Sequence, residues 1–290
     1  MIDFHLHSTS SDGFDTPSQL IDKAIGLNLK AIALTDHDTI IGLEEFISYG
    51  EEKNLIVIPG IEISIRHEPE RDLIDVHIIG LNIDYQSIKL INAIEEQIKG
   101  RIEQKKAICR RLRNELEFDI PFEEVMSIAG GRIIGRPHIV EIMIKNNPHL
   151  IEGKSKNDLF KMISVGGVAY VDREIELNFE ESIDLIKAAD GVPILAHPGI
   201  YDVPDNAKFI EFCVNTGIEG VEIEYTYSKN RPYYETNKAK WAQAFFPSYY
   251  RKMAKKHNLI MSGGSDYHGG KKGIRIGEAL VPNEYLKRFI

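Results

Sequence analysis

Short apolar runs and amphipathic stretches alternate along most of the chain. The apolar runs predict β-strands that end in polar clusters, and they lie at 2–7, 30–39, 55–64, 76–81, 191–199 and 259–269. Between them, apolar residues recur with helical spacing at 16–24, 41–53, 179–189, 207–216 and 249–257. Thr16 followed by Pro17 is typical of a helix start, because threonine caps the first turn and proline fits its first position. The alternation predicts parallel strands in an α/β sheet or barrel.

The first run contains two histidines that a strand would place on one face. Side chains alternate between the faces of a strand, so His5 and His7 would point one way while Phe4 and Leu6 point the other. A lone pair of this kind is most often an ordinary strand edge. Glu62 is a second signal, because a carboxylate between two isoleucines is costly to bury unless a cation or hydrogen bonds compensate it.

Histidines and carboxylates recur where the other predicted strands run out into loops. Any one of them could be a satisfied core residue, but their recurrence, together with Asp12 in a turn, predicts a multinuclear metal site. The candidate ligands are His5, His7, Asp12, His37, Glu62, His77, His197, Asp266 and His268. In α/β barrels the chemistry gathers at the carboxyl ends of the strands, where these residues fall.

The alternation of strand and helix breaks in the middle of the chain. Residues 85–165 predict an inserted helical subdomain, which leaves 1–84 and 166–290 for the barrel. A basic run in the insertion is either a solvated helix face or a guide for phosphates, and it comprises Arg101, Lys105, Lys106, Arg110, Arg111 and Arg113. Within 130–139, Arg136 offers a planar fork of donors suited to phosphate oxygens, and His138 can donate a hydrogen bond or a proton. An arginine before a proline is also common at a helix start.

A stretch at 225–251 mixes aromatic side chains with cations. The aromatic residues are Tyr227, Tyr233, Tyr234, Trp241, Phe245, Phe246, Tyr249 and Tyr250, and the cations are Lys229, Arg231, Lys238, Lys240 and Arg251. Such a mixture can stack bases and hold phosphates. The simpler alternative is a helix-rich loop whose rings pack on the barrel rim. The sequence leaves both open.

Composition favours a cytoplasmic enzyme. A chain of 290 residues can hold one barrel with an insertion, and two cysteines, Cys109 and Cys213, predict free thiols in a reducing compartment. No stretch reaches the roughly 20 apolar residues of a membrane span, and residues 2–7 have the pattern of a strand, not of a signal peptide. The net charge of -9 argues against coating long nucleic acid. Bound divalent cations would still make the site attractive to a small anionic substrate.

The motifs together resemble the PHP (polymerase and histidinol phosphatase) family of metal-dependent phosphoesterases. The resemblance covers nearly the whole chain, and its motifs are His5-Leu6-His7, Asp12-Gly13, Thr35-Asp36-His37-Asp38, Gly60-Ile61-Glu62, Val76-His77, Ala196-His197-Pro198-Gly199 and Gly264-Ser265-Asp266-Tyr267-His268. The insertion with Gly135-Arg136-Pro137-His138 is similar to the branch of nucleoside 3',5'-bisphosphate phosphatases and the related 5'-3' exoribonuclease. The aromatic stretch is longer than the family's usual connection.

The resemblance implies a distorted (β/α)7 TIM-like barrel that holds two or three divalent ions of manganese, iron or zinc. It implies three ligand sets: His5, His7, Glu62 and Asp266; then Glu62, His77 and His197; and then Asp12, His37 and His268. Asp36 and Asp38 are expected to orient ligands. A metal-bridged hydroxide would attack phosphorus, with Arg136 and His138 binding phosphate and Asp38, His138 or a metal-bound water as the leaving-group acid.

Three functions are compatible with the sequence. The first is a phosphatase of mononucleotides or nucleoside 3',5'-bisphosphates, with 5'-3' trimming of short oligoribonucleotides. The second is a small-metabolite phosphatase of the histidinol-phosphate type, which would not need base-stacking aromatic residues. The third is a metal-stabilised binding module without turnover, against which the intact set of ligands argues. The physiological substrate, the loaded metals and the oligomeric state are open at this stage.

Overall fold

Seven strands form one curved sheet within the residues that the computed structural model describes, which are 1–130, 134–230, 232–270 and 273–290. The strands are paired in chain order: β1 (Ile2–Asp3), β2 (Ala31–Leu34), β3 (Ile56–Ser64), β4 (His77–Leu81), β5 (Val192–Leu195), β6 (Gly220–Glu224) and β7 (Ile260–Gly263). Beyond β1, the N–H of Phe4 donates to the carbonyl of Gly263 at 3.1 Å, which brings the two edges of the sheet together. The predicted α/β barrel is confirmed.

The fourth strand corrects the expectation of an all-parallel sheet. β4 runs antiparallel to β3 and to β5, whereas the other neighbouring pairs are parallel. Residues 65–76 join β3 to β4 with only a short 3-10 turn, Pro69–Arg71, and lack the α-helix that usually carries a parallel crossover. The reversal places the first residue of β4, His77, opposite Ser64 at the end of β3.

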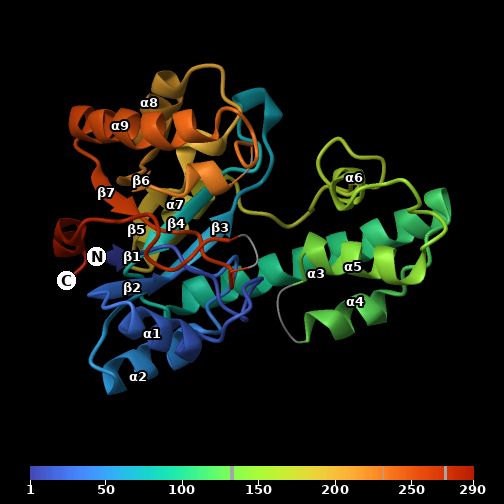
Figure 1. The fold of residues 1–290 in the computed structure, drawn as a ribbon, viewed down its shortest axis with the longest axis horizontal. Helices are drawn as coiled ribbons and strands as arrows, with labels where there is room; N and C mark the ends of the chain where they lie inside the picture. The colour runs from blue at the N-terminus through green and yellow to red at the C-terminus, as the bar shows by residue number, and fades with distance from the viewer. Residues whose placement is uncertain (131–133, 231, 271–272) are drawn as a thin grey trace. The chain divides into compact units, whose positions relative to one another are not determined.

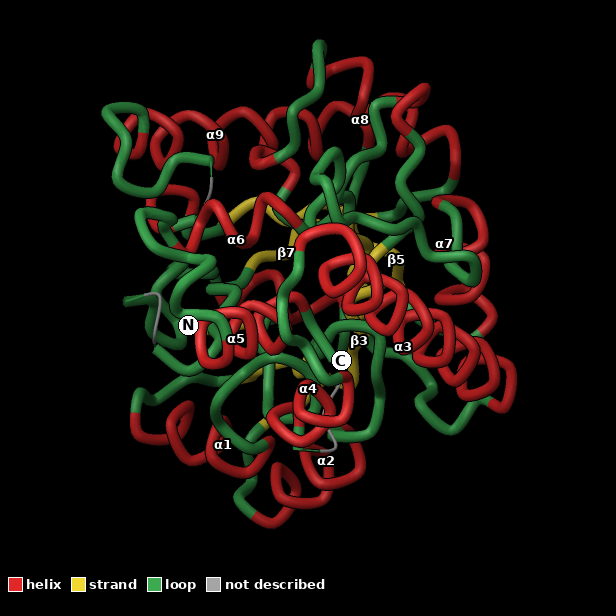
Figure 2. Tube along the Cα trace, turned by 90° about the vertical axis from the view of Figure 1, so that its right-hand side faces the viewer, coloured by secondary structure: helices red, strands yellow, loops and turns green. Residues whose placement is uncertain are grey.

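Five helices accompany the strands in the described part of the barrel. They are α1 (Pro17–Gly26), α2 (Leu43–Glu52), α7 (Phe179–Ala188), α8 (Asn206–Thr216) and α9 (Ala239–His257), and they lie outside the strands (Figures 1 and 2). Thr16 caps α1 as predicted, and its hydroxyl accepts the N–H of Gln19 at 3.2 Å. Helix α9 begins well before the predicted 249 and passes through Pro247, a residue that ordinarily ends or kinks a helix.

The chain divides into two units, of which the larger, Met1–Ile94 with Leu177–Ile290, contains the barrel. The smaller unit, Glu95–Glu176, is helical. It contains most of α3 (Ile88–Leu116), together with α4 (Phe122–Ala129), α5 (Arg136–Asn146) and α6 (Lys156–Met162). Residues 131–133 of the predicted phosphate-binding segment and Arg231 of the aromatic stretch lie outside the described residues. A role of the insertion as a substrate-binding cap stays a prediction.

Each unit has an apolar core of its own. In the barrel, side chains from the strands pack with the carboxyl-terminal segment, where the rings of Phe4 and Phe289 meet edge to face at 5.4 Å between centroids. In the helical unit, Ile108 and Leu112 of α3 pack with Ile139 and Met143 of α5. No described helix is both long and apolar enough to cross a membrane.

Candidate metal centre and active site

The nine candidate ligands come together at one end of the barrel, although they lie on seven separate segments. His5 and His7 follow β1, Asp12 lies in the loop before α1, and His37 follows β2. His197 follows β5, and Asp266 and His268 follow β7. Glu62 lies within β3, and His77 begins β4. Because β4 is antiparallel, its amino-terminal end meets the carboxyl ends of the parallel strands.

Glu62 is the centre of the group. Its side chain is buried, and five imidazole nitrogens lie 2.9–3.2 Å from its two oxygens. Oε2 faces His5, His7 and His37, and Oε1 faces His77 and His197. Burial by itself would raise the pKa of Glu62, but the charges of His37, His5 and His77 hold it well below its usual range. The ionised carboxylate therefore has both oxygens available to bridge cations.

Four overlapping groups of ligand atoms are close enough to hold a metal ion. Their members are His7, Asp12, His37 and His268; His5, His7 and Asp266; His5, Glu62 and His197; and His37, Glu62 and His77. In each group the ligand atoms lie within 4.8 Å of one another. The groups share His5, His7, His37 and Glu62, so the three predicted ligand sets form one continuous cluster. The assignment of particular side chains to particular ions stays a prediction.

Several of these atoms are buried without a hydrogen bond. Among the described residues, they include Nδ1 of His7, Nδ1 of His37 and Oδ1 of Asp12, although Nδ1 of His37 lies 3.1 Å from Glu62 and Oδ1 of Asp12 lies 3.2 Å from His268. Burying polar atoms in this way is costly unless something else compensates them. Burial also holds the pKa of His37 well below its usual range. Imidazole nitrogen with carboxylate oxygen suits manganese, iron or zinc, so the side chains fit the predicted ions.

A further carboxylate, Glu222 of β6, supports the cluster and was not among the predicted residues. Its Oε1 lies 3.0 Å from Nδ1 of His5, and its Oε2 accepts the backbone N–H of His197 at 2.7 Å. The hydroxyl of Tyr225 donates to Asp266 at 2.8 Å. Contacts of this kind orient metal ligands. The signal that singled out Glu62, a carboxylate between β-branched residues, also occurs at Val221-Glu222-Ile223 and could have identified Glu222.

Comparison with known proteins agrees with this geometry. The PHP domain profile matches residues 3–125. The 5'-3' exoribonuclease Rnm of Escherichia coli (strain K12) is 30% identical over 287 residues, which cover 96% of this chain and 88% of the exoribonuclease. The chain belongs to the PHP domain family. It is accordingly a metal-dependent phosphoesterase, a hydrolase of phosphoric ester bonds.

Two other proteins match over nearly the same length. The 3',5'-nucleoside bisphosphate phosphatase of Chromobacterium violaceum is 27% identical over 296 residues, which cover 94% of this chain and 89% of that enzyme. A crystal structure of a protein from Bifidobacterium adolescentis has a TM-score of 0.79 at 24% identity and covers 99% of this chain and 94% of that one. The second likeness shows that the two proteins share a fold.

Asp36 and Asp38 follow β2 in the PHP barrel and contact backbone or serine groups. Asp36 accepts the N–H of Ser8 at 2.7 Å and its hydroxyl at 2.6 Å, and so holds the loop that follows His7. Asp38 is buried, has a left-handed backbone at φ 48°, and accepts the N–H of Ser64 at 2.8 Å. These contacts are compatible with orienting roles. A catalytic role for Asp38 stays a prediction.

Arg136 and His138 lie at the start of α5 in the helical unit. Nδ1 of His138 accepts the N–H of Gly135 at 3.1 Å, which leaves the ring proton of a neutral His138 on Nε2. Arg136 donates to the hydroxyl of Ser164 at 3.1 Å. The structure therefore gives both residues a local role at the helix start. Their binding of phosphate stays a prediction.

The basic run of α3 divides into buried and exposed members. Arg110, Arg111 and Arg113 are exposed, whereas Lys105 is only 6% exposed. Burial, together with the charges of Arg101, Arg173 and Arg136, holds the pKa of Lys105 well below its usual range. Nearby, Arg173 pairs with Glu176 at 3.1 Å. Arg136 thus belongs to a cluster of basic residues within the helical unit, in which Arg101, Arg136 and Arg173 act on the buried Lys105.

Proposed function

We propose that this protein hydrolyses phosphate monoesters of nucleotides, including mononucleotides and nucleoside 3',5'-bisphosphates, and trims short oligoribonucleotides from the 5' end. The observation that carries the proposal is the convergence of nine imidazole and carboxylate side chains around Glu62. Full-length relatives named as a 5'-3' exoribonuclease and a 3',5'-nucleoside bisphosphate phosphatase support the nucleotide substrate.

The residues that would hold the ions are the nine of the cluster. His5, His7, Glu62 and Asp266 would form one set, Glu62, His77 and His197 a second, and Asp12, His37 and His268 a third. Divalent ions bound there supply Lewis acidity, which activates the attacking water and neutralises charge on the phosphoryl oxygens. Glu62 connects the first two sets, because its two oxygens face different histidines.

The surrounding contacts decide which nitrogen of each ring faces the ions. Nδ1 of His5 lies against the carboxylate of Glu222, so it carries the proton and Nε2 presents its lone pair to the cluster. Nδ1 of His268 lies 2.9 Å from the carbonyl oxygen of Asp266, and the same reasoning leaves Nε2 of His268 facing Asp12. The Glu222 carboxylate and the Asp266 carbonyl would thus hold His5 and His268 in the tautomer that can coordinate a cation.

Arg136 and His138 are the proposed phosphate-binding residues. The charged groups that act most on Lys105 are Arg101, Arg173 and Arg136, with Glu176 as a carboxylate among them. Such a local excess of positive charge attracts a phosphate. Nε2 of His138 carries a proton that could be given to a leaving oxygen, and Asp38 is the other side chain proposed for that role.

A substrate panel in the presence of manganese tests the proposal. Phosphate release is measured from a nucleoside 3',5'-bisphosphate, from AMP and from histidinol phosphate, and mononucleotide release is measured from a 5'-phosphorylated short RNA. We expect turnover of the nucleotide substrates and its loss after chelation. Turnover of histidinol phosphate alone would favour a small-metabolite phosphatase. Metal binding with no turnover of any substrate would favour a binding module.

A further inference from the structure

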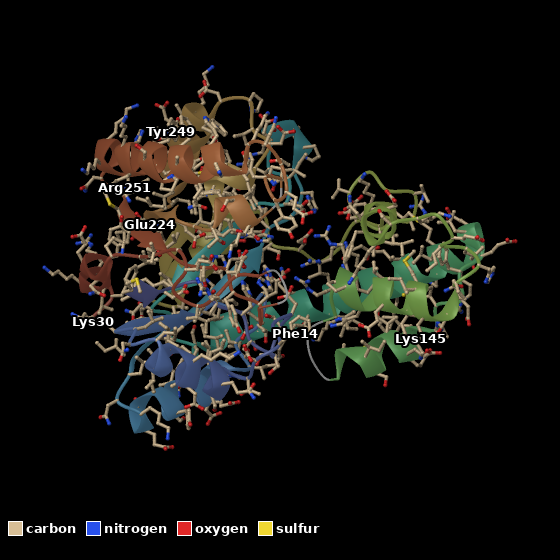
Figure 3. The ribbon with its side chains drawn as sticks, viewed as in Figure 1. Phe14, Lys30, Lys145, Glu224, Tyr249 and Arg251 are labelled. Carbon is tan, nitrogen blue, oxygen red and sulfur yellow. The ribbon has the colours of Figure 1, made fainter. Side chains whose placement is uncertain are left out.

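Helix α9 is strongly basic, in a chain whose net charge is negative. Its cations are Lys240, Arg251, Lys252, Lys255 and Lys256, and it contains no aspartate or glutamate. Arg251 pairs with Glu224 of β6, and both lie on the barrel side of the helix in Figure 3. The four lysines are exposed, and no carboxylate of the described chain lies within ion-pair distance of them. The outer surface of α9 therefore attracts anions.

The same helix carries a stack of exposed aromatic rings. Trp241 and Phe245 are stacked with 4.9 Å between centroids and 14° between planes, and Phe245 and Tyr249 follow at 5.5 Å and 19°. Trp241 is 50% exposed and Phe245 is 41% exposed. We call Trp241, Phe245 and Tyr249 the aromatic ladder. Tyr249, the last of the three along the chain, is labelled on α9 in Figure 3.

Lysines continue the face of the helix on which the ladder lies. Residues three or four positions apart share one face of a helix. Lys238 precedes Trp241 by three positions, Lys252 follows Tyr249 by three, and Lys256 follows Lys252 by four. The stripe of cation, three rings and two cations is roughly 27 Å long at 1.5 Å per residue. A polymer that alternates flat rings with negative charges matches this stripe.

The inner side of the ladder packs on the segment that carries His197. The ring of Trp241 meets those of Tyr233 and Phe246, with centroids 6.4 Å and 5.5 Å apart. The hydroxyl of Tyr233 donates to the carbonyl of Gly199 at 2.9 Å, and Phe246 lies so close to Gly199 that a Cβ there would meet its ring at 2.6 Å. Gly199 is two residues after His197, so aromatic side chains connect the metal centre to the ladder.

Stabilisation of α9 alone does not account for these features. Aromatic pairs four residues apart do stabilise a helix, and rings buried against the barrel serve packing, as Phe246 does. Neither effect calls for a row of half-exposed rings, and neither explains lysines without carboxylates on the same face. A contiguous exposed apolar surface of this kind is typical of a binding site.

We propose that the aromatic ladder and its lysines bind the bases and phosphates of a single-stranded oligoribonucleotide whose 5' end is processed at the metal centre. The inference rests on the proposed function and concerns its action on oligoribonucleotides. Bases stack on aromatic side chains with little regard to sequence, and lysines along the path neutralise phosphates. The ladder would bind nucleotides downstream of the end that is cleaved, so a mononucleotide would not reach it.

Trp241 makes the test direct, because it is the single tryptophan of the chain. The full-length protein is titrated with an oligouridylate of roughly eight nucleotides while a chelator prevents turnover, and tryptophan fluorescence is followed. We expect saturable quenching by the oligouridylate and none by AMP. Phe245→Ala should raise the dissociation constant for oligouridylate at least about fivefold. Trp241→Phe should bind nearly as well as the wild type, which is measured by the fluorescence anisotropy of a labelled oligouridylate.

The charge of the stripe is tested separately with a matched control. Lys252→Glu should weaken oligouridylate binding and flatten its dependence on salt, whereas Lys30→Glu makes the same change of charge near β1 and β2, away from α9, and should do neither (Figure 3). Manganese-dependent hydrolysis of AMP should be unchanged in Phe245→Ala and Lys252→Glu, which shows that each variant is folded.

Particular outcomes would overturn the inference while leaving the proposed function intact. One is normal AMP hydrolysis with no fluorescence change on addition of oligouridylate. Another is quenching that Phe245→Ala does not weaken. A blue shift of Trp241 emission with vesicles of anionic phospholipid, without any response to oligouridylate, would assign the ladder to a membrane surface. Absence of hydrolysis together with tight, ladder-dependent oligouridylate binding would instead count against the proposed function alone.

Discussion

Replacing Glu222 with glutamine tests whether this buried carboxylate controls the metal ligands. In the native protein both oxygens accept hydrogen bonds, one from Nδ1–H of His5 and the other from the backbone N–H of His197. Glutamine has nearly the same shape but offers only one oxygen, since its amide nitrogen is a donor. One of the two buried donors must then face another donor.

The size of the effect follows from that single lost acceptor. A buried donor left without a partner costs roughly 1–3 kcal/mol, which corresponds to about 5- to 150-fold in an equilibrium constant. If His5 is the residue that loses its partner, its proton can move from Nδ1 to Nε2. Nε2, the nitrogen that faces Glu62, then has no free lone pair for a metal ion. We therefore expect Glu222→Gln to weaken manganese binding by about 10- to 100-fold.

The assay is calorimetric titration of the metal-free protein with manganese, followed by measurement of kcat on AMP at saturating metal. Glu224→Gln is the matched control, because Glu224 lies on the same strand and is also buried but pairs with Arg251 outside the metal cluster. Manganese affinity in Glu222→Gln within about twofold of the wild type would refute the reasoning. So would an equal loss in Glu224→Gln.

Three further predictions follow from the same structure. Manganese should stabilise the protein, because the buried ligand atoms of the cluster gain a partner when it binds. At a free manganese concentration a hundred times the dissociation constant, the gain is about 2.7 kcal/mol. A melting temperature that a chelator does not lower in differential scanning fluorimetry would contradict this prediction. Arg136→Ala should raise KM for nucleotide substrates about tenfold or more, because it removes a charged phosphate contact. Arg110→Ala, on the exposed face of α3, should leave KM unchanged. If steady-state kinetics show kcat and KM both unchanged in Arg136→Ala, Arg136 does not bind phosphate. Burial and the neighbouring Arg101, Arg173 and Arg136 hold the pKa of Lys105 in the folded protein well below its usual range. Between that pKa and about 10.4, the unfolded chain binds one more proton than the folded chain, so the free energy of unfolding should rise with pH. Urea denaturation of Lys105→Met should show a smaller rise over the same pH range.

The metal cluster was predictable because burial of its residue types is costly. His5, His7 and Glu62 stand within apolar sequence, where a polar side chain needs a compensating partner. The periodicity of the runs placed most of these residues at strand ends without knowledge of their neighbours. Glu222 carried the same signal, but no strand was predicted at 220–224, where β6 lies.

Local sequence did not predict how far α9 extends. A proline within a helix removes one backbone hydrogen bond, so a boundary near Pro247 is the ordinary expectation. In the structure the helix continues through Pro247, and Phe246 and Tyr250 on either side of it are buried against the barrel. Packing by residues distant in sequence offsets the lost bond, and the ladder exists only because the helix reaches back to Trp241.

The amino-acid sequence by itself determined most of the order of strands and helices, though not β6, together with the class of fold and the identity of the candidate metal ligands. These depend on local periodicity and on the cost of burying particular side chains, both of which can be read along the chain. Only the tertiary structure decided that β4 is antiparallel, that Glu222 supports His5 and His197, and that Lys105 is buried among arginines. Those facts depend on which distant segments become neighbours when the sheet closes, and no local pattern specifies that.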